Sequence, residues 1–377
     1  MHSRADAASA EWVTDDHALA ATTADWGRVI GLDTEFQRTD TFFPIPGLYQ
    51  VSSGEDVWFL DPLTLSDLGP FLEVLEDRRT IKIMHACSED LEVLRHHFGA
   101  VPRGLFDTQV ANAFVSPDFS VSFTRLVASV LGVVLEQSET RSDWLARPLT
   151  PAQERYAWED VHYLPPLHAE LTERLTRVGR LDWLREEMDR RARFVPADPE
   201  QYYLSVKRAG RMDGPTRSRL QALCAWRERY AMVVDRPRNR VLRDEVLVEL
   251  AQQSQLDTRE LERHLPGGAV RRFGDELLAA HVAAAENRDH PPPPDPALGA
   301  AAQAAVSAMR DVAQGVAEAL GMAPELLGRR RDVEACVRHY MATGELTDLY
   351  DGWRGPVLGD AFRRCLESAR LGRGRTS

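Results

Sequence analysis

The chain has 377 residues, of which 44% are hydrophobic and 28% are charged, and its formal net charge is −12. This length favours two or three domains over one, and the composition allows each domain a sizeable apolar core. Because no run of about 18 apolar residues is present, the sequence argues against a transmembrane helix and against a membrane partner.

Two other features bear on the compartment. The first sixteen residues, MHSRADAASAEWVTDD, contain no apolar signal-peptide core. The four cysteines show no CxxC spacing and no clustering, which argues against a zinc site or a disulfide framework; they are Cys87, Cys224, Cys336 and Cys365. We therefore expect a cytoplasmic protein in a reducing environment.

Strand and helix patterns alternate in the first half of the chain. Three consecutive strands are predicted at residues 28–36, 47–53 and 57–63, with the turn SSGED joining the last two. A fourth strand at 80–86 runs into a helical pattern at 88–98. Further helices are expected within residues 104–114, 123–131 and 154–177. This order predicts an α/β structure with a mixed sheet and flanking helices.

Beyond about residue 196 the strand patterns stop and amphipathic helices take over. Near residue 290 the segment RDHPPPPDPALGA predicts a stiff linker, because four consecutive prolines cannot continue a helix. A second helical block follows, and its loose similarity to the first indicates a duplicated module. We predict an α/β domain followed by two all-α helical domains, with bounds at 1–205, 206–290 and 291–377, the last beginning with the linker.

An acidic pair lies at the end of the first predicted strand. Asp33 and Glu35 come directly after the apolar residues of RVIGL. Side chains at i and i+2 of a strand point to the same face, so the two carboxylates face the same way. Two like charges held together cost free energy unless a positive group joins them.

Three more side chains extend this pair. Asp90 falls in the first turn of the helix after strand 80–86, with Ser88 as a candidate N-cap. Tyr156 and Asp160 are four residues apart in a helical pattern and so share one face. Divalent cations would relieve the repulsion among four carboxylates, and an all-oxygen ligand set suits Mg²⁺ or Mn²⁺. Two such ions about 4 Å apart can stabilise both the attacking and the leaving oxygen of a phosphoryl displacement.

The stretches LDTEFQRTDTFFP, HACSEDLEVL, FDTQVA and RSDWLARPLTPAQERYAWEDVHYL resemble motifs of the DEDD exonuclease superfamily. Tyr156 marks the DEDDy branch, since the DEDDh branch has a histidine where this chain has Arg155. With the two helical blocks interpreted as tandem HRDC domains, nearly the whole chain is similar to the bacterial ribonuclease D family. The resemblance implies a ribonuclease H-like sheet in residues 1–205 and 3′–5′ exonuclease activity.

The resemblance also implies a role for each site residue. Asp33 would bridge two divalent ions, Mg²⁺ or Mn²⁺, and Glu35 and Asp160 would ligate the ion that binds the attacking water. Asp90 would hold the second ion, partly through water. Tyr156 would orient the attacking water; a phenol with an ordinary pKa near 10 need only position a water that a metal ion has already acidified.

Three residues are candidate RNA contacts: His85, Arg141 and Trp144. For His85 the alternative is a structural hydrogen bond, and for the RSDWL stretch the alternative is a loop anchor. Asp107, in LFDTQ, is expected to cap the next helix and is left out of the site.

The charge of the two helical blocks suggests different roles. Residues 203–245 contain eleven Lys or Arg against five Asp or Glu, so the first block is the expected RNA contact, with a solvated helix face as the alternative. The second block carries GRRRD at residues 328–332, and its expected role is that of a scaffold.

We expect a monomeric 3′–5′ exoribonuclease that trims 3′ extensions of precursor tRNAs and other small stable RNAs and releases nucleoside 5′-monophosphates. Three alternatives stay open at this point. They are a DNA exonuclease of the same superfamily, a catalytically idle RNA-binding scaffold, and a structural calcium site.

Overall fold

The computed structural model describes residues 9–135, 142–193, 197–286 and 288–373. The chain forms two compact units: unit 1 comprises Met1–Gln37, Pro46–Phe194 and Leu298–Ser377, and unit 2 comprises Arg38–Ile45 and Val195–Ala297. The second helical block thus packs with the α/β part of the chain in unit 1, whereas the first forms most of unit 2. The domain bounds expected from the sequence stay a prediction.

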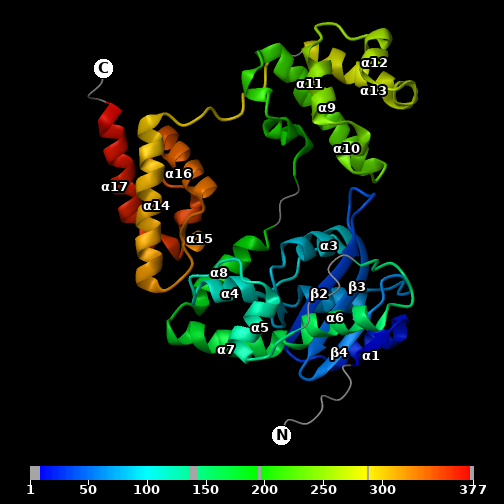
Figure 1. Ribbon diagram of the computed structural model, residues 1–377, viewed down its shortest axis with the longest axis vertical. Helices are drawn as coiled ribbons and strands as arrows, with labels where there is room; N and C mark the ends of the chain where they lie inside the picture. Colours follow the sequence, from blue (N-terminus) through cyan, green and yellow to red (C-terminus); the bar gives the residue numbers. More distant parts are fainter. Residues whose placement is uncertain (1–8, 136–141, 194–196, 287, 374–377) are drawn as a thin grey trace. The chain divides into compact units, whose positions relative to one another are not determined.

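Unit 1 is built on a mixed sheet of six strands in the order β1-β4-β3-β2-β5-β6 (β2, β3 and β4 are labelled in Figure 1). β3 pairs antiparallel with β4, whereas the pairs β1–β4, β2–β5 and β5–β6 are parallel. The strands are β1 (Glu11–Val13), β2 (Val29–Gln37), β3 (Ile45–Ser53), β4 (Asp56–Leu60), β5 (Ile81–Met84) and β6 (Leu105–Asp107). The α/β prediction is confirmed, although the sequence pattern indicated neither β1 nor β6.

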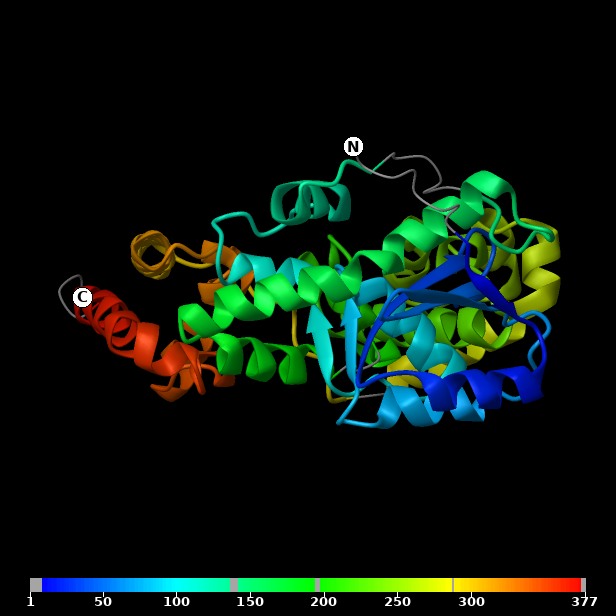
Figure 2. The ribbon, with the colours of Figure 1, turned by 90° about the horizontal axis from the view of Figure 1, so that it is seen from below.

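Helices cover both faces of the sheet, as Figure 2 shows for α6 and α7 on one side and α1 and α2 on the other. Because both faces are covered, the consecutive residues Ile30, Gly31 and Leu32 of β2 are all buried. The helices of this part are α1 (Asp16–Asp25), α2 (Gly69–Glu76), α3 (Ser88–Phe98), α4 (Thr108–Ala113), α5 (Phe123–Leu131), α6 (Pro151–His162), α7 (Leu164–Arg177) and α8 (Leu181–Arg191).

The helix expected at 154–177 is two helices, α6 and α7, that meet at Tyr163. Pro165 and Pro166 lack the N–H that a helix interior requires, so they are tolerated only in a first turn and α7 starts anew there. α6 begins earlier than expected, at Pro151, because Thr150 and Gln153 form a capping box.

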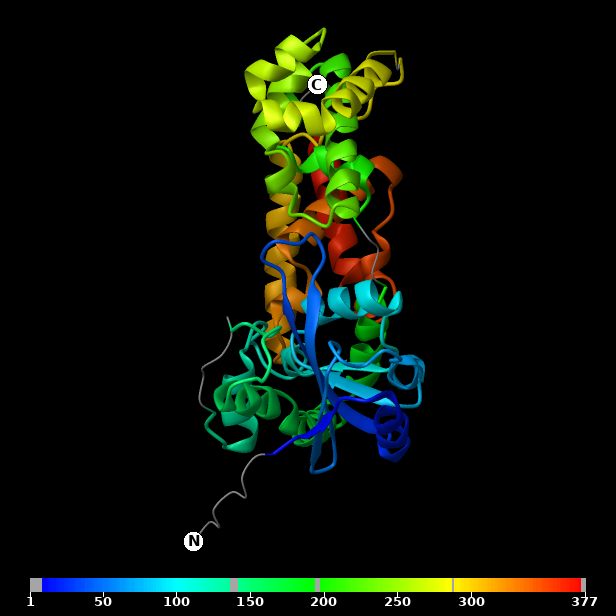
Figure 3. The ribbon, with the colours of Figure 1, turned by 90° about the vertical axis from the view of Figure 1, so that its right-hand side faces the viewer.

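The second helical block shares the core of unit 1. Trp353 stacks on Trp183 of α8 with ring centroids 5.0 Å apart, and the Arg180 guanidinium donates hydrogen bonds to the carbonyls of Phe114 and Leu320. Figures 1 and 3 show α14 and α17 side by side. The block consists of α14 (Ala300–Leu320), α15 (Pro324–Leu327), α16 (Arg330–Thr343), a short 3₁₀ turn (Asp348–Tyr350) and α17 (Arg354–Arg373).

Unit 2 is helical over residues 197–286, which confirms the predicted change after residue 196. Its core is a separate apolar cluster that includes Leu220, Leu223, Leu247 and Leu277. The elements are two 3₁₀ turns (Pro199–Ser205 and Ala209–Arg211) and the helices α9 (Gly214–Val233), α10 (Arg238–Val241), α11 (Asp244–Gln252), α12 (Thr258–His264) and α13 (Gly267–Glu286).

Candidate active site

Asp33 and Glu35 lie inside β2, which continues to Gln37, and not at the end of the strand as expected. The parallel neighbour β5 pairs with β2 only as far as Gly31 opposite Ile83. Beyond that point the first turn of α3 follows β5 and lies against β2. The two carboxylates therefore lie at the carboxyl end of β5, where the paired strand gives way to a helix.

Gly31 allows α6 to come close to the sheet. A Cβ atom at position 31 would lie 2.9 Å from the Val161 carbonyl oxygen, which is too short for a real contact. The same carbonyl accepts a 2.7 Å hydrogen bond from Ser52 Oγ of β3. The end of α6 is thereby fixed against β2 and β3, and Asp160 is the residue just before this contact.

The acidic residues from the three motifs come together in space. Carboxylate oxygens of Asp33, Glu35 and Asp160 all lie within 4.8 Å of one another. Asp90, 9% exposed, accepts a 2.6 Å hydrogen bond from the Thr34 hydroxyl, which follows Asp33 in β2.

Burial raises the pKa of each of the four carboxyls, and repulsion from neighbouring carboxylates adds to this rise. Burial raises the pKa of Asp33 well above its usual range, and Asp90, Asp160 and Glu35 raise it further. Burial also raises the pKa of Glu35 to about 9, of Asp160 to about 7 and of Asp90 to about 6. No lysine or arginine is among the main neighbours that shift these four pKa values in the described part of the chain. The cluster therefore lacks a protein cation that would neutralise it.

The hydroxyl of Tyr156 lies within hydrogen-bonding reach of Asp160, one helical turn further along α6. Burial raises the pKa of this phenol above its usual value, and the charges of Asp160, Glu35 and Asp33 raise it further. Tyr156 is therefore a neutral hydrogen-bond donor at physiological pH.

Asp107 is the helix cap that the sequence predicted, and it also shapes the turn that leads to Asp90. Its carboxylate accepts hydrogen bonds from the backbone N–H groups of Gln109 and Val110 at the start of α4. It accepts two more from Ala86 and Cys87, immediately before α3. Nothing in the local sequence pattern signalled this second pair, because it spans 20 residues or more.

The start of α3 differs from the expected one. The helix begins at Ser88 itself, and Cys87 occupies the N-cap position without a side-chain hydrogen bond. Ala86, just before it, adopts a left-handed backbone with φ of 54°. Such a conformation is strained for a residue with a Cβ, and the two hydrogen bonds to Asp107 hold it.

Of the three candidate RNA contacts, the structure describes His85 and Trp144, and both side chains make contacts inside the protein. Both ring nitrogens of His85 are used inside the protein, Nδ1 with the Thr108 hydroxyl at 2.8 Å and Nε2 with the Val121 carbonyl at 3.2 Å. This geometry favours the alternative structural role. Trp144 is only 2% exposed, and its ring centroid lies 6.0 Å from that of Tyr156. Trp144 is therefore a buried neighbour of the Tyr156 ring. Arg141 lies outside the described residues.

The basic segment 203–245 buries two of its eleven basic residues inside unit 2 and exposes seven. The Arg227 side chain is fully buried, with ion pairs to Glu228 at 2.9 Å and Asp244 at 2.7 Å. The buried Arg219 donates to the Ala251 carbonyl. These two arginines stabilise the helical unit from within, and the seven exposed basic residues of the segment are the ones that a partner would meet.

The donor set of the acidic cluster fits a hard divalent cation. All four side chains offer carboxylate oxygens, which are the ligands that Mg²⁺ and Mn²⁺ prefer, and the raised pKa values show that the site favours added positive charge. No helix of the described residues is long and apolar enough to cross a membrane.

Comparisons with known proteins agree with this geometry. Residues 10–176 match the family model for 3′–5′ exonucleases, and residues 217–280 match that of the HRDC domain. The chain is 40% identical to ribonuclease D of Pseudomonas paraeruginosa, covering 95% of this chain and 98% of that protein. It is 34% identical to ribonuclease D of Escherichia coli K12, covering 95% and 98%.

A solved structure extends the likeness to the fold. The crystal structure of Escherichia coli RNase D, described as an exoribonuclease involved in structured RNA processing, matches with a TM-score of 0.87 and 34% identity, covering 96% of this chain and 99% of that one. DEDD exonucleases use divalent metal ions, as the acidic cluster requires. The chain belongs to the ribonuclease D family and is a 3′–5′ exoribonuclease, a hydrolase of phosphodiester bonds.

Proposed function

We propose that this enzyme trims 3′ extensions of precursor tRNAs and other small structured RNAs, one nucleotide at a time, by two-metal-ion hydrolysis that releases nucleoside 5′-monophosphates. The observation that carries the mechanism is the convergence of carboxylate oxygens of Asp33, Glu35 and Asp160 within 4.8 Å, next to Asp90. The substrate class is supported by the description of the Escherichia coli relative as an enzyme of structured RNA processing.

Each carboxylate has a distinct part in this proposal. Asp33, central to the cluster, would ligate both ions, Glu35 and Asp160 the first, and Asp90 the second. Mg²⁺ or Mn²⁺ bound there would acidify a water for the attack and would neutralise charge on the leaving 3′ oxygen. The hydrogen bond from Thr34 fixes the rotamer of Asp90 and so places its free oxygen.

Tyr156 positions the nucleophile and does not act as a base. Its raised pKa keeps the phenol protonated, so it can hold a water by a hydrogen bond but cannot remove a proton from it near neutral pH. Trp144 packs against the phenol and limits its motion.

A comparison of three labelled substrates tests the substrate class. The first is a precursor tRNA with a 3′ extension, the second an unstructured RNA with the same 3′ sequence, and the third its DNA counterpart. We expect processive or stepwise shortening of the precursor that stops near the folded stem, and little shortening of DNA. Equal degradation of DNA and RNA would contradict the RNA assignment, and degradation of the unstructured RNA alone would contradict the role in structured RNA.

A further inference from the structure

A cavity of about 320 Å³ lies in unit 1 between α8, the start of α3 and the second helical block. Five arginines and four carboxylates line it. The arginines are Arg190 and Arg191 of α8 and Arg329, Arg331 and Arg354 of the second block. The GRRRD motif, for which the sequence suggested only a scaffold role, thus contributes two guanidinium groups to a cavity shared with the catalytic part of the chain.

One carboxylate serves three of these arginines. Glu187, 1% exposed, accepts from Arg190 at 2.7 Å, from Arg191 at 2.8 Å and from Arg354 at 2.7 Å. A single negative charge cannot neutralise three guanidinium groups. Asp107, a second acid of the lining, is already used by four backbone N–H groups. Asp332, a third, pairs with Arg331 at 3.4 Å.

Arg329 has no ion pair with a carboxylate among the residues that the structure describes. Its guanidinium lies 4.7 Å from the centre of the Phe119 ring, and that of Arg191 lies 6.0 Å from the same ring. Burial lowers the pKa of Arg329, and the nearby charge of Arg191 lowers it further; Asp332 and Glu187 act in the opposite direction but do not outweigh these effects. Like charges are thus held together on one aromatic platform, which favours an anion between them.

The first residues of α3 complete the cavity. Cys87 and Ser88 line it, and no side chain caps the N-terminus of this 11-residue helix. N–H groups at a helix start add to the attraction for an anion that the arginines provide. Asp90, in the same turn, belongs to the catalytic cluster. The cavity and the acidic cluster therefore share one helical turn.

We propose that this arginine pocket binds a backbone phosphate of the RNA strand a few nucleotides upstream of the 3′ end that occupies the catalytic site. This inference rests on the proposed function, because it assumes RNA at the four carboxylates. Arginine suits phosphate through its planar fork of donors, and Phe119 offers a flat surface beside it. The second helical block thereby becomes part of the substrate path.

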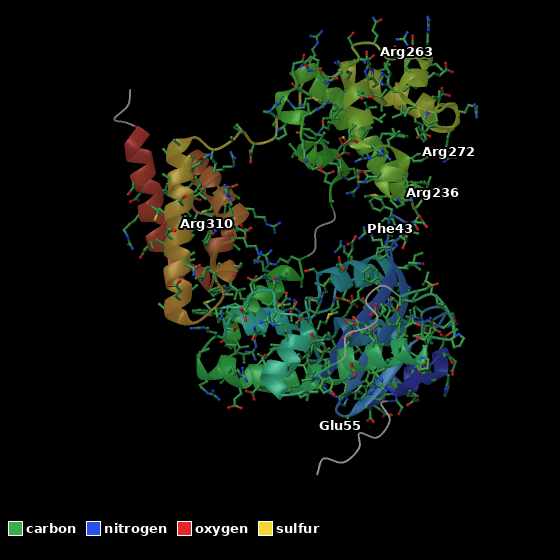
Figure 4. The ribbon with its side chains drawn as sticks, viewed as in Figure 1. Phe43, Glu55, Arg236, Arg263, Arg272 and Arg310 are labelled. Carbon is green, nitrogen blue, oxygen red and sulfur yellow. The ribbon has the colours of Figure 1, made fainter. Side chains whose placement is uncertain are left out.

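Binding measurements in an Asp33→Asn background, which prevents degradation, test the proposal. Fluorescent single-stranded RNAs of three and twelve nucleotides are titrated with Arg329→Ala and with Arg331→Ala, whose side chain is 81% exposed and so spares the fold. Arg310→Ala is the matched control, an exposed arginine of α14 outside the cavity (Figure 4). Thermal unfolding of each variant checks that the fold is intact.

We expect each pocket variant to weaken binding of the twelve-nucleotide RNA about tenfold. The slope of log affinity against log salt should fall by about 0.7 for each phosphate that the variant no longer neutralises. Binding of the three-nucleotide RNA, which is too short to reach the pocket, and all binding by Arg310→Ala should match the Asp33→Asn parent.

Several results would overturn the proposal. Unchanged affinity of Arg329→Ala and Arg331→Ala for the twelve-nucleotide RNA would overturn it. The proposed function would still stand in that case if the unmutated enzyme shortens the same RNA. An equal loss for both RNA lengths would place the effect at the catalytic site. Stabilisation by inorganic phosphate that depends on Arg329, without any change in RNA affinity, would assign the pocket to a free anion. Failure of the parent to bind RNA and of the unmutated enzyme to shorten it would refute both proposals.

Discussion

At the scale of single residues, the site is defined by negative charge that the protein itself leaves uncompensated. Asp33, Glu35 and Asp160 approach one another within 4.8 Å, and burial keeps water from screening them. A fold that holds such a cluster is less stable without cations than with them, and the difference depends on pH.

The pH dependence of the metal-free protein follows from Glu35. Burial first, then Asp160 and Asp90, raise its pKa in the folded state to about 9, from an ordinary value of 4.5. Between these values the folded state holds more protons than the unfolded state, so the free energy of unfolding falls as pH rises through this window. In EDTA, the melting temperature of Glu35→Gln should fall less between pH 5 and pH 9 than that of the unmutated protein. Parallel pH profiles for the two proteins would contradict this account.

Tyr156 tests how the nucleophile is positioned. Tyr156→Phe removes the hydroxyl but keeps the ring against Trp144, so we expect kcat to fall by about tenfold to hundredfold with little change in KM. The shape of the pH–rate profile below pH 10 should not change, because the phenol stays protonated there. Tyr163→Phe, at the junction of α6 and α7, is the control. A rise in rate with pH that the unmutated enzyme shows and Tyr156→Phe lacks would identify the phenol as a base instead.

At the scale of elements, α8 is the link between the α/β part of unit 1 and the second helical block. Glu187 of α8 pairs at 2.7 Å with Arg354, the first residue of α17, across 167 positions of sequence. Both side chains are nearly fully buried, and Arg354 also donates to the Leu326 carbonyl. An ion pair of this kind fixes how two segments pack, because either partner alone would be a buried charge.

Glu187→Gln should therefore destabilise the protein by about 3–5 kcal/mol, since it leaves Arg354 buried without a counter-charge. Burial raises the pKa of Glu187, but hydrogen bonding to Arg190 and the charges of Arg354, Arg191 and Arg190 outweigh burial and hold it at about 2. Its contribution to stability is thus complete above pH 4.5 and is lost as pH falls from there towards 2.

Urea unfolding at pH 7 and pH 3 measures both effects. The control is Glu173→Gln, which removes an exposed i,i+4 pair with Arg177 and should change stability little. Equal unfolding midpoints for Glu187→Gln and Glu173→Gln at pH 7 would contradict the role of the buried pair.

Local sequence patterns predicted those strands and helices whose formation depends on residues close together in the sequence. The strand around Asp33 and the helices that carry Asp90 and Asp160 follow from period-2 and period-3.6 patterns. β1 is only three residues long and is held in the sheet by parallel pairing with β4. The paired residues are more than 40 positions apart in the sequence, so no local pattern predicts this strand. The hydrogen bonds of Asp107 to the turn before α3 were missed for the same reason. The pair Pro165-Pro166 does signal the helix break at Tyr163, because proline is tolerated only in the first turn of a helix, but the prediction of one helix at 154–177 overlooked it.

At the scale of the whole molecule, the catalytic carboxylates, the arginine pocket and the second helical block all belong to unit 1. In the first helical block, Arg219 and Arg227 are buried inside unit 2, whereas seven of the eleven basic residues of segment 203–245 are exposed. Salt sensitivity of RNA binding should therefore respond to substitutions in the arginine pocket as well as to substitutions of the exposed basic residues in the first block.

In the proposed mechanism, four converging carboxylates hold divalent metal ions, and the enzyme hydrolyses RNA from its 3′ end. The most direct measurement follows a 5′-labelled precursor tRNA with a 3′ extension, incubated with the purified protein in Mg²⁺, in Mn²⁺ or in EDTA, beside Asp33→Asn. We expect a ladder of products shortened from the 3′ end in either metal, and no shortening in EDTA or by Asp33→Asn. Shortening that persists in EDTA, or that Asp33→Asn retains, would contradict this mechanism.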